Sequence, residues 1–444
     1  MYPALFRAFR PYWRGGRELR QRQKELEQTQ WWSIGEIEKL QLDRLKKLIK
    51  YAYEHVPYYS KLYKSLEIHP DDIKSLKDFQ SLPFITREDI KSHINELVTD
   101  DPNHEIFPDS TGGSTGVPMQ FFIERAYDRW DQALELRGRG WYGVREGDRI
   151  AFVWGAKQDM PDWSMPTRLK AQILQERYLN AFSMTEQKMQ LFAKSLVKWK
   201  PAMFRAYASA LTLFAQYLKD HKITGIEPRL IETTAEKVTL PQRDLLESVF
   251  HCKVADWYSA REMGTIAFQC PVGSLHVGET RFLEIVAKNN VARPGELGEV
   301  VITSLHQYGM PFIRYKIGDM AILETHPCSC GRGLPVLREV VGRMQDFLVT
   351  SDGRFVHGGY FPHTFRLYPE ISQYQVYQPD RDHLQVRFVC KRPIDSNWIA
   401  TIHHELQACF GTKMDISVEI VDAIPLTLAG KRRFIISNVK PDFA

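Results

Sequence analysis

From about residue 105 onward, short apolar runs of strand character alternate with turns and helical patterns. The runs include "MQFFIE", "RIAFVWG", "RLIETTAE", "RFLEIVA" and "GEVVITSL", while residues 202–219 repeat apolar side chains at helical spacing. Mixed strands and helices over this length predict an α/β domain with several sheets. The chain has 444 residues, more than the ~250 to 300 at which a single core stops growing. A second domain is therefore expected.

The two ends of the chain differ from this middle part. Residues 1–95 are highly charged and repeat apolar side chains at helical spacing, which predicts a mostly helical layer packed on the larger domain. The last hundred residues read as a small α+β unit. We expect an N-terminal core domain at 1–342, whose α/β part is 96–342, a boundary at 343–346, and a small C-terminal domain at 347–444.

Composition excludes several classes of protein. A hydrophobic fraction of 43% and a charged fraction of 25% are ordinary for a globular chain, so disordered and fibrous classes are excluded. The net charge of +5 comes from 59 basic and 54 acidic residues. This balance gives no argument for a nucleic-acid partner.

Two observations bear on location. No run approaches the ~18 apolar residues of a membrane span, and the start "MYPALFRAFRPYWRGG" lacks the apolar core of a signal peptide. A cytoplasmic protein is therefore expected. The same opening segment interleaves aromatic residues with arginines, which suits either contact with a membrane surface or packing against the main domain. Pro11 would interrupt a long helix there.

A glycine- and hydroxyl-rich stretch, "PDSTGGSTGVP", spans residues 108–118. Gly112, Ser114 and Gly116 spell G-x-S-x-G, as in a hydrolase nucleophile elbow, which needs a strand before it and a helix after it. Here the preceding "DDPNHEIFPDS" is polar and broken by proline, and the following "MQFFIE" is strand-like, so the context does not fit. A Walker loop is excluded because Val117 stands where that motif has lysine. A phosphate-binding loop or a solvated turn remains.

Four later stretches bear on that choice: "DWYSAREMG" at 256–264, "FIRYKIGDM" at 312–320, "VGRMQDFLV" at 341–349 and "IPLTLAGKRRF" at 424–434. Together with "STGGSTGVP", this ordered set resembles the core motifs of the adenylate-forming superfamily, and within it the phenylacetate-CoA ligase-like branch that includes the CapK-type capsule-biosynthesis proteins. The resemblance covers nearly the whole chain. It implies a large multi-sheet α/β domain followed by a small α+β domain that rotates about a hinge.

The implied reaction is attack of a small-molecule carboxylate on the α-phosphate of ATP, giving an acyl-adenylate and pyrophosphate. Charge accumulates on the phosphates, so positioned donors, Mg²⁺ and a cation are expected. The loop that would hold the β- and γ-phosphates consists of Ser110, Thr111, Gly112, Gly113, Ser114, Thr115 and Gly116. Thr115 is also expected to act in catalysis. Many relatives carry a lysine at the position of Val117, so one cation is missing from this loop.

The remaining motifs imply further nucleotide contacts. Tyr258 would lie against adenine, and Glu262 would bind Mg²⁺. Arg261 departs from the family pattern. Two placements of its side chain are left open, contact with a phosphate or exposure to solvent. Glu236, in "TTAE", would contact the base.

Asp319 would accept hydrogen bonds from the ribose hydroxyls, with pairing to Arg314 or Lys316 as the alternative. Arg343 would contact ribose or phosphate. Gln345 replaces the usual Asp or Lys of the hinge. Lys431 matches the family's catalytic lysine, the alternative being a solvated basic run.

Cys270, His276, Cys328 and Cys330 form a possible metal-ligand set. Three thiolates and an imidazole suit tetrahedral Zn²⁺, although C-x-C is tighter than the common C-x-x-C. Proteins of the resembled branch often carry this set. Buried free cysteines with a satisfied histidine are the alternative.

Two main hypotheses follow. The first is an AMP-forming ligase that transfers the acyl group to CoA, an amine, a sugar or a carrier protein, and no feature chooses among these acceptors. The second is a nucleotide-binding member of the fold with little turnover, an assembly or carrier factor in polysaccharide biosynthesis, which the departures at Val117, Arg261 and Gln345 favour. Aryl acids fit the resemblance, with Trp154, Tyr207 and Phe204 as candidate pocket walls. The sequence leaves a homodimer open.

Overall fold

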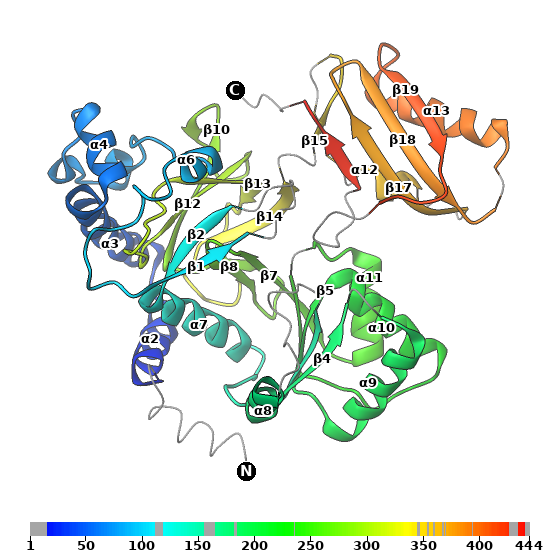
Figure 1. The fold of residues 1–444 in the computed structure, drawn as a ribbon, viewed down its shortest axis with the longest axis horizontal. Coiled ribbons are helices and arrows are strands. Elements are labelled where there is room, and N and C mark those ends of the chain that lie inside the picture. The colour runs from blue at the N-terminus through cyan, green and yellow to red at the C-terminus, as the bar shows by residue number, and fades with distance from the viewer. Residues whose placement is uncertain are drawn as a thin grey trace.

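The computed structural model describes residues 16–111, 119–154, 165–181, 184–234, 236–343, 347–352, 355–357, 360–365, 368, 370–392, 394–425 and 434–439. Figure 1 shows a large body, in which helices surround a long sheet, and a smaller C-terminal sheet with its own helices set apart from it. This arrangement confirms the predicted fold class, a large α/β part followed by a small α+β part.

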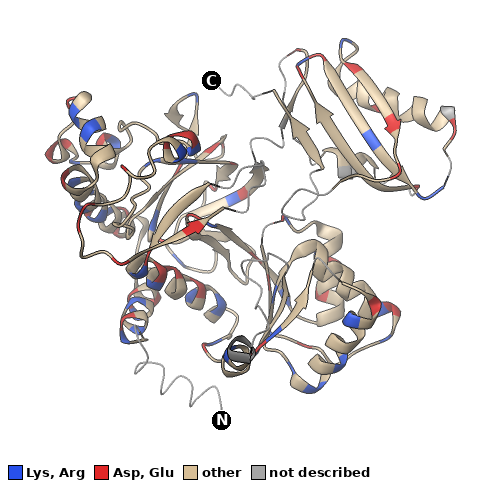
Figure 2. Ribbon diagram, in the orientation of Figure 1, with Lys and Arg blue, Asp and Glu red and all other residues tan. Residues whose placement is uncertain are grey.

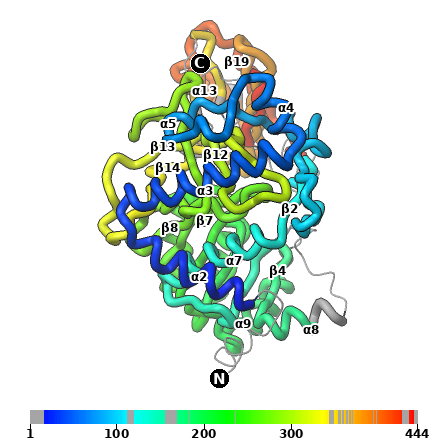
Figure 3. Tube along the Cα trace, turned by 90° about the vertical axis from the view of Figure 1, so that its left-hand side faces the viewer, coloured from blue at the N-terminus to red at the C-terminus, as the bar shows by residue number. Residues whose placement is uncertain are grey.

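The N-terminal layer is helical, as its apolar spacing predicts. Ser33 and Glu36 form a reciprocal capping box that starts the longest of these helices. Its buried face, which includes Leu45, Leu48 and Ile49, joins the main core. Figure 3 shows this layer lying across the large sheet. The elements are α2 (Gly16–Thr29), α3 (Ile34–His55), α4 (Pro57–Ser65), η2 (Pro70–Asp72), α5 (Leu76–Phe79) and α6 (Arg87–Ser92).

One large sheet organises the middle of the chain. Its order is β11-β10-β12-β13-β14-β9-β8-β7-β6-β5-β3-β4. The strands are β3 (Ile150–Trp154), β4 (Glu176–Asn180), β5 (Met203–Tyr207), β6 (Leu230–Thr234), β7 (Lys253–Ala260), β8 (Gly264–Gln269), β9 (Leu275–Val277), β10 (Arg281–Ala287), β11 (Asn290–Val291), β12 (Leu297–Ser304), β13 (Tyr315–Leu323) and β14 (Val336–Arg343). The run from β4 to β7 is parallel and the rest is antiparallel.

Helices cover the parallel part of the sheet. The second core cluster lies between its strands and the helices α9 (Glu186–Trp199), α10 (Ala208–Asp220) and α11 (Leu240–Phe250). The helices α7 (Arg125–Gly140) and α8 (Met165–Ile173) complete this part of the fold. Every residue of β6 is buried, as expected for a parallel strand with both faces covered. Basic and acidic residues are interspersed along the helices (Figure 2).

Two local expectations were wrong. The helical pattern predicted from residue 202 begins instead with β5, because this segment pairs with β3 and β6 inside the sheet, and α10 starts only at Ala208. The polar segment before the glycine-rich loop forms β1 (Ile106–Ser110), which pairs with β2 (Gln120–Glu124) in a two-stranded ribbon. Proline has no main-chain N–H, and in a ribbon of two edge strands it can occupy a position that donates no hydrogen bond to the other strand. The ribbon therefore tolerates Pro108.

The C-terminal unit has a core of its own, which includes Val376, Phe388 and Leu406. Its strands form the sheet β19-β18-β17-β20 and the pair β15-β16. The elements are β15 (Phe347–Val349), β16 (Phe355–His357), α12 (Tyr360–Phe365), β17 (Ile371–Gln378), β18 (His383–Cys390), α13 (Ser396–Phe410), β19 (Asp415–Ile420) and β20 (Ile435–Ser437). The large sheet ends at Arg343 and β15 begins at Phe347, so the predicted boundary falls between them, and the division into domains stays a prediction.

Among the described residues, no helix combines the length and hydropathy needed to cross a membrane.

Candidate functional site

The glycine-rich stretch connects the two strands of the β1–β2 ribbon. At its base, the Thr111 main-chain N–H donates to the Met119 carbonyl at 2.9 Å, and the Met119 N–H donates to Thr111 Oγ1 at 3.0 Å. Ser110 pairs with Gln120 one step further out. The loop itself, with Gly112, Gly113, Ser114, Thr115, Gly116 and Val117, lies outside the described residues. Because a strand and not a helix follows Met119, the topology does not match a nucleophile elbow.

Two arginines reach this ribbon from distant parts of the chain. Arg87 Nη2 donates to Thr111 Oγ1 at 2.8 Å. Arg261 Nε and Nη2 donate to the two carboxylate oxygens of Asp109 at 3.0 and 3.2 Å. The second contact is bidentate. The sequence left two placements for the side chain of Arg261, against a phosphate or in solvent, and the structure pairs it with Asp109 on β1.

A tyrosine hydroxyl joins two of the predicted nucleotide contacts. Tyr258 on β7 donates through its OH to Asp319 Oδ2 at 2.7 Å. Asp319, on β13, is buried and lies opposite Arg343 in the register of β13 and β14. The basic residues considered as alternative partners engage other carboxylates, since Arg314 Nη2 lies 2.9 Å from Glu284 Oε1 and Lys316 Nζ lies 3.2 Å from Glu299 Oε2.

A second tyrosine links β13 to the proposed Mg²⁺ ligand. The Tyr315 hydroxyl donates to Glu262 Oε1 at 3.1 Å, and the side chain of Glu262 is buried. Tyr315 and Asp319 lie four residues apart on the same strand, while Tyr258 and Glu262 lie four apart at the end of β7 and in the turn after it. The "YSARE" segment is thus tied to β13 by two hydroxyl-to-carboxylate hydrogen bonds. The carboxylate of Asp319 suits recognition of a polyol, because it only accepts hydrogen bonds. The carboxylate of Glu262 suits a hard cation.

Glu236, expected to contact the base, caps a helix. Its carboxylate accepts hydrogen bonds from Ser209 N at 2.8 Å and Ser209 Oγ at 3.0 Å, at the start of α10. A carboxylate is favourable at this end of a helix because the first N–H groups have no helical partner. Contact with adenine stays a prediction.

Aromatic side chains meet at the carboxyl ends of β3 and β5. The rings of Trp154 and Tyr207 stack with centroids 4.5 Å apart. Phe204 does not join them, because its fully buried side chain packs against Phe250, with centroids 4.9 Å apart, in the core under α9–α11. Alternate side chains of a strand point to opposite faces, so the expectation that Phe204 lines a pocket with Tyr207 was wrong.

Lys431 lies outside the described residues, in the segment between Pro425 and Phe434.

The four predicted metal ligands come together. Cys270 follows β8, His276 lies on β9, and Cys328 and Cys330 lie between β13 and β14. Their ligand atoms all lie within 4.8 Å of one another, with Cys270 Sγ 3.8 Å from Cys328 Sγ and Cys330 Sγ 3.3 Å from His276 Nε2. A tetrahedral zinc with Zn–S bonds of about 2.3 Å sets its sulfurs about 3.8 Å apart. The donor set and its spacing therefore fit Zn²⁺.

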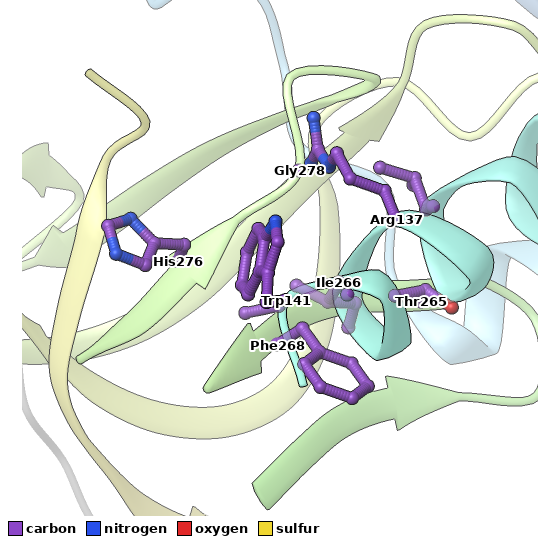
Figure 4. Close-up of a pocket in the computed structure, with 10 residues that line it drawn as sticks. Arg137, Trp141, Thr265, Ile266, Phe268, His276 and Gly278 are labelled. Carbon is purple, nitrogen blue, oxygen red and sulfur yellow. The ribbon is translucent and has the colours of Figure 1, made fainter. Parts of the chain in front are cut away.

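The surroundings of His276 suit a neutral metal ligand. Burial lowers the pKa of His276 to about 4, so the imidazole is uncharged near pH 7 and has a lone pair to offer. Figure 4 shows its ring beside Trp141, whose ring meets it edge-on with centroids 5.7 Å apart. The cavity next to these rings has a volume of about 10 Å³, which is room for one water molecule.

The Cys-x-Cys turn also holds the N-terminal helices. The main-chain N–H of Gly333 donates to the Gln30 carbonyl at 3.0 Å, and Arg332 Nε donates to Gln30 Oε1 at 3.0 Å. The Arg332 guanidinium lies over Trp31 and Trp141, at 4.9 and 4.3 Å from the ring centroids. The turn between α2 and α3 is thus docked on the segment that carries two of the thiols.

Gly333→Ala is expected to destabilise the fold by about 3 kcal/mol. A methyl group at this position would overlap the main-chain oxygen of Trp32, so the backbone of the docked turn must shift. Gly35→Ala is the matched control, because a methyl group there meets nothing within 4 Å and alanine favours the helix. Urea unfolding of both variants tests this, and equal stability of the two would contradict the docking described.

The sequence is similar to a known protein family and to several known proteins. A family model described as the CapK C-terminal domain matches residues 348–438. Protein CapK of Staphylococcus aureus is 27% identical over 414 residues, covering 90% of this chain and 89% of CapK. Phenylacetate-coenzyme A ligase of Thermus thermophilus is 25% identical over 325 residues, covering 70% of this chain and 71% of the ligase. The chain is homologous to CapK and to the phenylacetate-coenzyme A ligases.

Solved structures agree on the fold of this CapK homologue. A 2-hydroxyisobutyryl-CoA ligase in its postadenylation state, in complex with R3-HIB-AMP, superposes with a TM-score of 0.73 at 21% identity and covers 93% of this chain and 92% of its own. The anthranilate CoA ligase AuaEII, in complex with anthranoyl-AMP, gives a TM-score of 0.52 at 17% identity and covers 73% of this chain and 65% of its own. At these identities the likeness shows a shared fold.

Three residues at the site were not anticipated from the sequence: Arg87, Asp109 and Tyr315. Arg87 stands 24 positions before its partner Thr111, and Asp109 stands 152 before Arg261. No local spacing connects such pairs, since only the tertiary fold brings them together. The one usable signal was the missing cation at Val117, which invites a search for a basic residue from elsewhere in the chain.

Proposed function

We propose that the protein activates a carboxylic acid with ATP. A carboxylate oxygen attacks the α-phosphorus, the bond from that phosphorus to the bridging oxygen breaks, and pyrophosphate leaves. The acyl group of the adenylate then passes to a nucleophile such as the thiol of CoA, with AMP as the leaving group. The observation that carries this proposal is the paired link of Tyr258 to Asp319 and Tyr315 to Glu262.

The roles of individual residues follow from their chemistry. Asp319 would accept hydrogen bonds from ribose, with its orientation set by Tyr258, while Tyr258 presents its ring to adenine. Glu262 would hold Mg²⁺, which neutralises charge on the phosphates when bound. The loop closed by Thr111 would wrap the β- and γ-phosphates. The stacked Trp154 and Tyr207 favour an aryl acid as substrate.

The test is a trapping experiment. The protein is incubated with ATP, Mg²⁺ and one acid at a time, and hydroxylamine converts any acyl-adenylate to a hydroxamate. We expect hydroxamate and AMP in equal amounts with at least one aryl acid. ATP binding without AMP from any acid would instead favour a nucleotide-binding factor of polysaccharide biosynthesis, a candidate supported by the homology to CapK and by Val117 and Gln345.

Glu262→Gln is expected to reduce the rate of hydroxamate formation by about 100-fold and to raise the Mg²⁺ concentration needed for half-maximal rate. Glutamine keeps the size of the side chain and an oxygen for the Tyr315 hydroxyl, so thermal stability should change little. Glu296→Gln, at an exposed loop glutamate, is the control. An unaltered Mg²⁺ dependence in Glu262→Gln would contradict the metal role.

We further propose that Cys270, His276, Cys328 and Cys330 hold a structural Zn²⁺. Four protein ligands leave no open position, which is the pattern of structural and not catalytic zinc. The thiols hold the turn on which Gln30 and Trp31 dock, so the ion would stabilise the join between the N-terminal helices and the sheet.

A further inference from the structure

Glu262 lies in the turn of the hairpin that joins β7 to β8. Ala260 and Gly264 pair at the end of this hairpin, and within the turn the Met263 N–H donates to the Ala260 carbonyl at 3.2 Å. The Tyr315 hydroxyl donates to one carboxylate oxygen of Glu262 at 3.1 Å. The position of that carboxylate also depends on the backbone of the turn, because the side chain moves with it. A metal ligand at this place therefore needs the turn itself to be held.

The side chain of Arg281, at the start of β10, contacts this turn directly. Its Nε donates to the carbonyl of Met263, the residue after Glu262, at 2.9 Å. The Arg281 side chain is fully buried, at 0% exposed. Its other nitrogens donate to Thr280 Oγ1 at 3.0 Å and to the Tyr127 hydroxyl at 2.9 Å. A buried charge that loses its partners is strongly unfavourable, so these contacts hold the guanidinium in one orientation.

Asp131, on α7, contacts the other side of the turn. Its Oδ1 accepts the Thr265 N–H at 2.5 Å and lies 3.2 Å from Arg281 Nη2. Gly264, with a φ of +56°, permits this approach, because a Cβ atom there would lie 2.3 Å from Asp131 Oδ1. Arg281 and Asp131 thus form an ion pair, and each member binds the main chain just after Glu262.

A purely structural role is the alternative, since this ion pair also joins α7 to β10. A buried ion pair, however, often contributes no more stability than well-packed apolar side chains. Hydrogen bonds that involve a charged group are stronger than neutral ones, and this pair places one at Met263 and one at Thr265. The contacts of the pair therefore favour a role in fixing the turn.

We propose that Arg281 and Asp131 are positioning residues that hold Glu262 for Mg²⁺ in the ATP site. The inference rests on the proposed function, in which Glu262 binds this ion, and adds the two residues that orient the ligand. Arg281 is too deeply buried to touch the nucleotide, so it acts through Glu262. Removing a group that orients a metal ligand typically lowers metal affinity by about 10- to 100-fold.

Isothermal titration of ATP into the full chain, once in excess Mg²⁺ and once in EDTA, tests the assignment. The ratio of the Kd in EDTA to the Kd in Mg²⁺ isolates the contribution of the ion. We expect this ratio to fall about 10-fold in Arg281→Lys and in Asp131→Asn, toward its value in Glu262→Gln. Lysine keeps the charge without the planar fork. Asparagine keeps an oxygen for the Thr265 N–H without the charge that pairs with Arg281.

Two further variants separate positioning from a general loss of stability. Arg139→Lys is the matched control, because Arg139 is also a buried arginine and pairs with Glu232 on β6. Its ratio should equal that of the wild type even where its melting temperature falls. Combining Asp131→Asn with Glu262→Gln should lower the ratio no further than Glu262→Gln alone, because both changes act on the same ligand.

The outcomes separate this inference from the proposed function. A wild-type ratio in both Arg281→Lys and Asp131→Asn would overturn the positioning role, and so would a double variant in which the two single losses multiply. Either result leaves the proposed function standing where Glu262→Gln lowers the ratio. A wild type that binds no ATP would overturn the proposed function and this inference with it. Should Arg281→Lys fail to fold in a thermal scan, Asp131→Asn decides alone.

Discussion

Lys431→Ala is expected to lower acid-dependent pyrophosphate exchange by at least about 100-fold. The adenylation step brings a carboxylate against the α-phosphate, and two anions at contact repel strongly in a site with little water. An ammonium group that contacts both would reduce this repulsion only in the transition state. The lysine stands four residues before β20, which pairs in parallel with β17 of the small sheet, so it belongs to the C-terminal unit.

A matched control separates a catalytic role of Lys431 from a general effect of positive charge in this segment. Arg432→Ala removes a charge from the same basic run and should retain most of the exchange. Lys431→Ala should also still form the thioester when supplied with synthetic acyl-adenylate and CoA, because the second step no longer joins two anions. Full exchange in Lys431→Ala, or an equal loss in both variants, would mean that this run is only a solvated basic segment.

Cys330→Ser is expected to lose bound zinc and to lower the melting temperature by about 10 °C. Metal binding contributes directly to folding free energy, roughly 10 to 16 kcal/mol in small zinc domains. A loss of roughly 9 kcal/mol would produce the stated shift in a chain of this size, because the entropy of unfolding is roughly 2.1 cal/mol/K per residue. The physical cause is local, because without the ion the buried Cys270 and His276 lose their partner and the turn that docks Gln30 is released.

Elemental analysis of the purified protein measures this directly, with one zinc per chain expected in the wild type and none in the variant. Cys252→Ser is the control, since Cys252 lies outside the cluster and is half-buried. It should keep both zinc and melting temperature. A wild type without zinc would mean that the cluster consists of free side chains, and a Cys330→Ser variant that keeps its zinc would contradict the assignment of Cys330 as a ligand.

The fold was largely predictable because its strands and helices carry ordinary apolar spacing. The strand β10 follows from a short apolar run of strand character, and the apolar face of α3 follows from helical spacing. The failures have physical causes. Phe204 was assigned to a helix because its spacing to Leu211 and Phe214 suits one, yet pairing of its strand with β3 and β6 decides the outcome. Pro108 made the segment before the glycine-rich loop look unlike a strand, yet this segment forms β1 by pairing with β2.

For the candidate site, too, some features could be predicted from the sequence and others could not. Tyr258, Glu262 and Asp319 could be named from motifs, and the sheet brings them together. The hydroxyl-to-carboxylate links between them could not be predicted, because β7 and β13 lie far apart in sequence and several strands apart in the sheet. The contact of Arg87 with the loop base likewise depends on a bridge between Ile85 and Tyr315 that no local pattern encodes.

The central claim is that this chain forms an acyl-adenylate, and acid-dependent exchange of labelled pyrophosphate into ATP tests it most directly. The assay requires no acyl acceptor, so it reports the first step alone across a panel of aryl, amino and short-chain acids. We predict exchange that depends on one class of acid, with aryl acids strongest, and that disappears in Lys431→Ala. Measurable ATP binding without exchange for any acid would contradict the account and indicate a nucleotide-binding protein that does not adenylate.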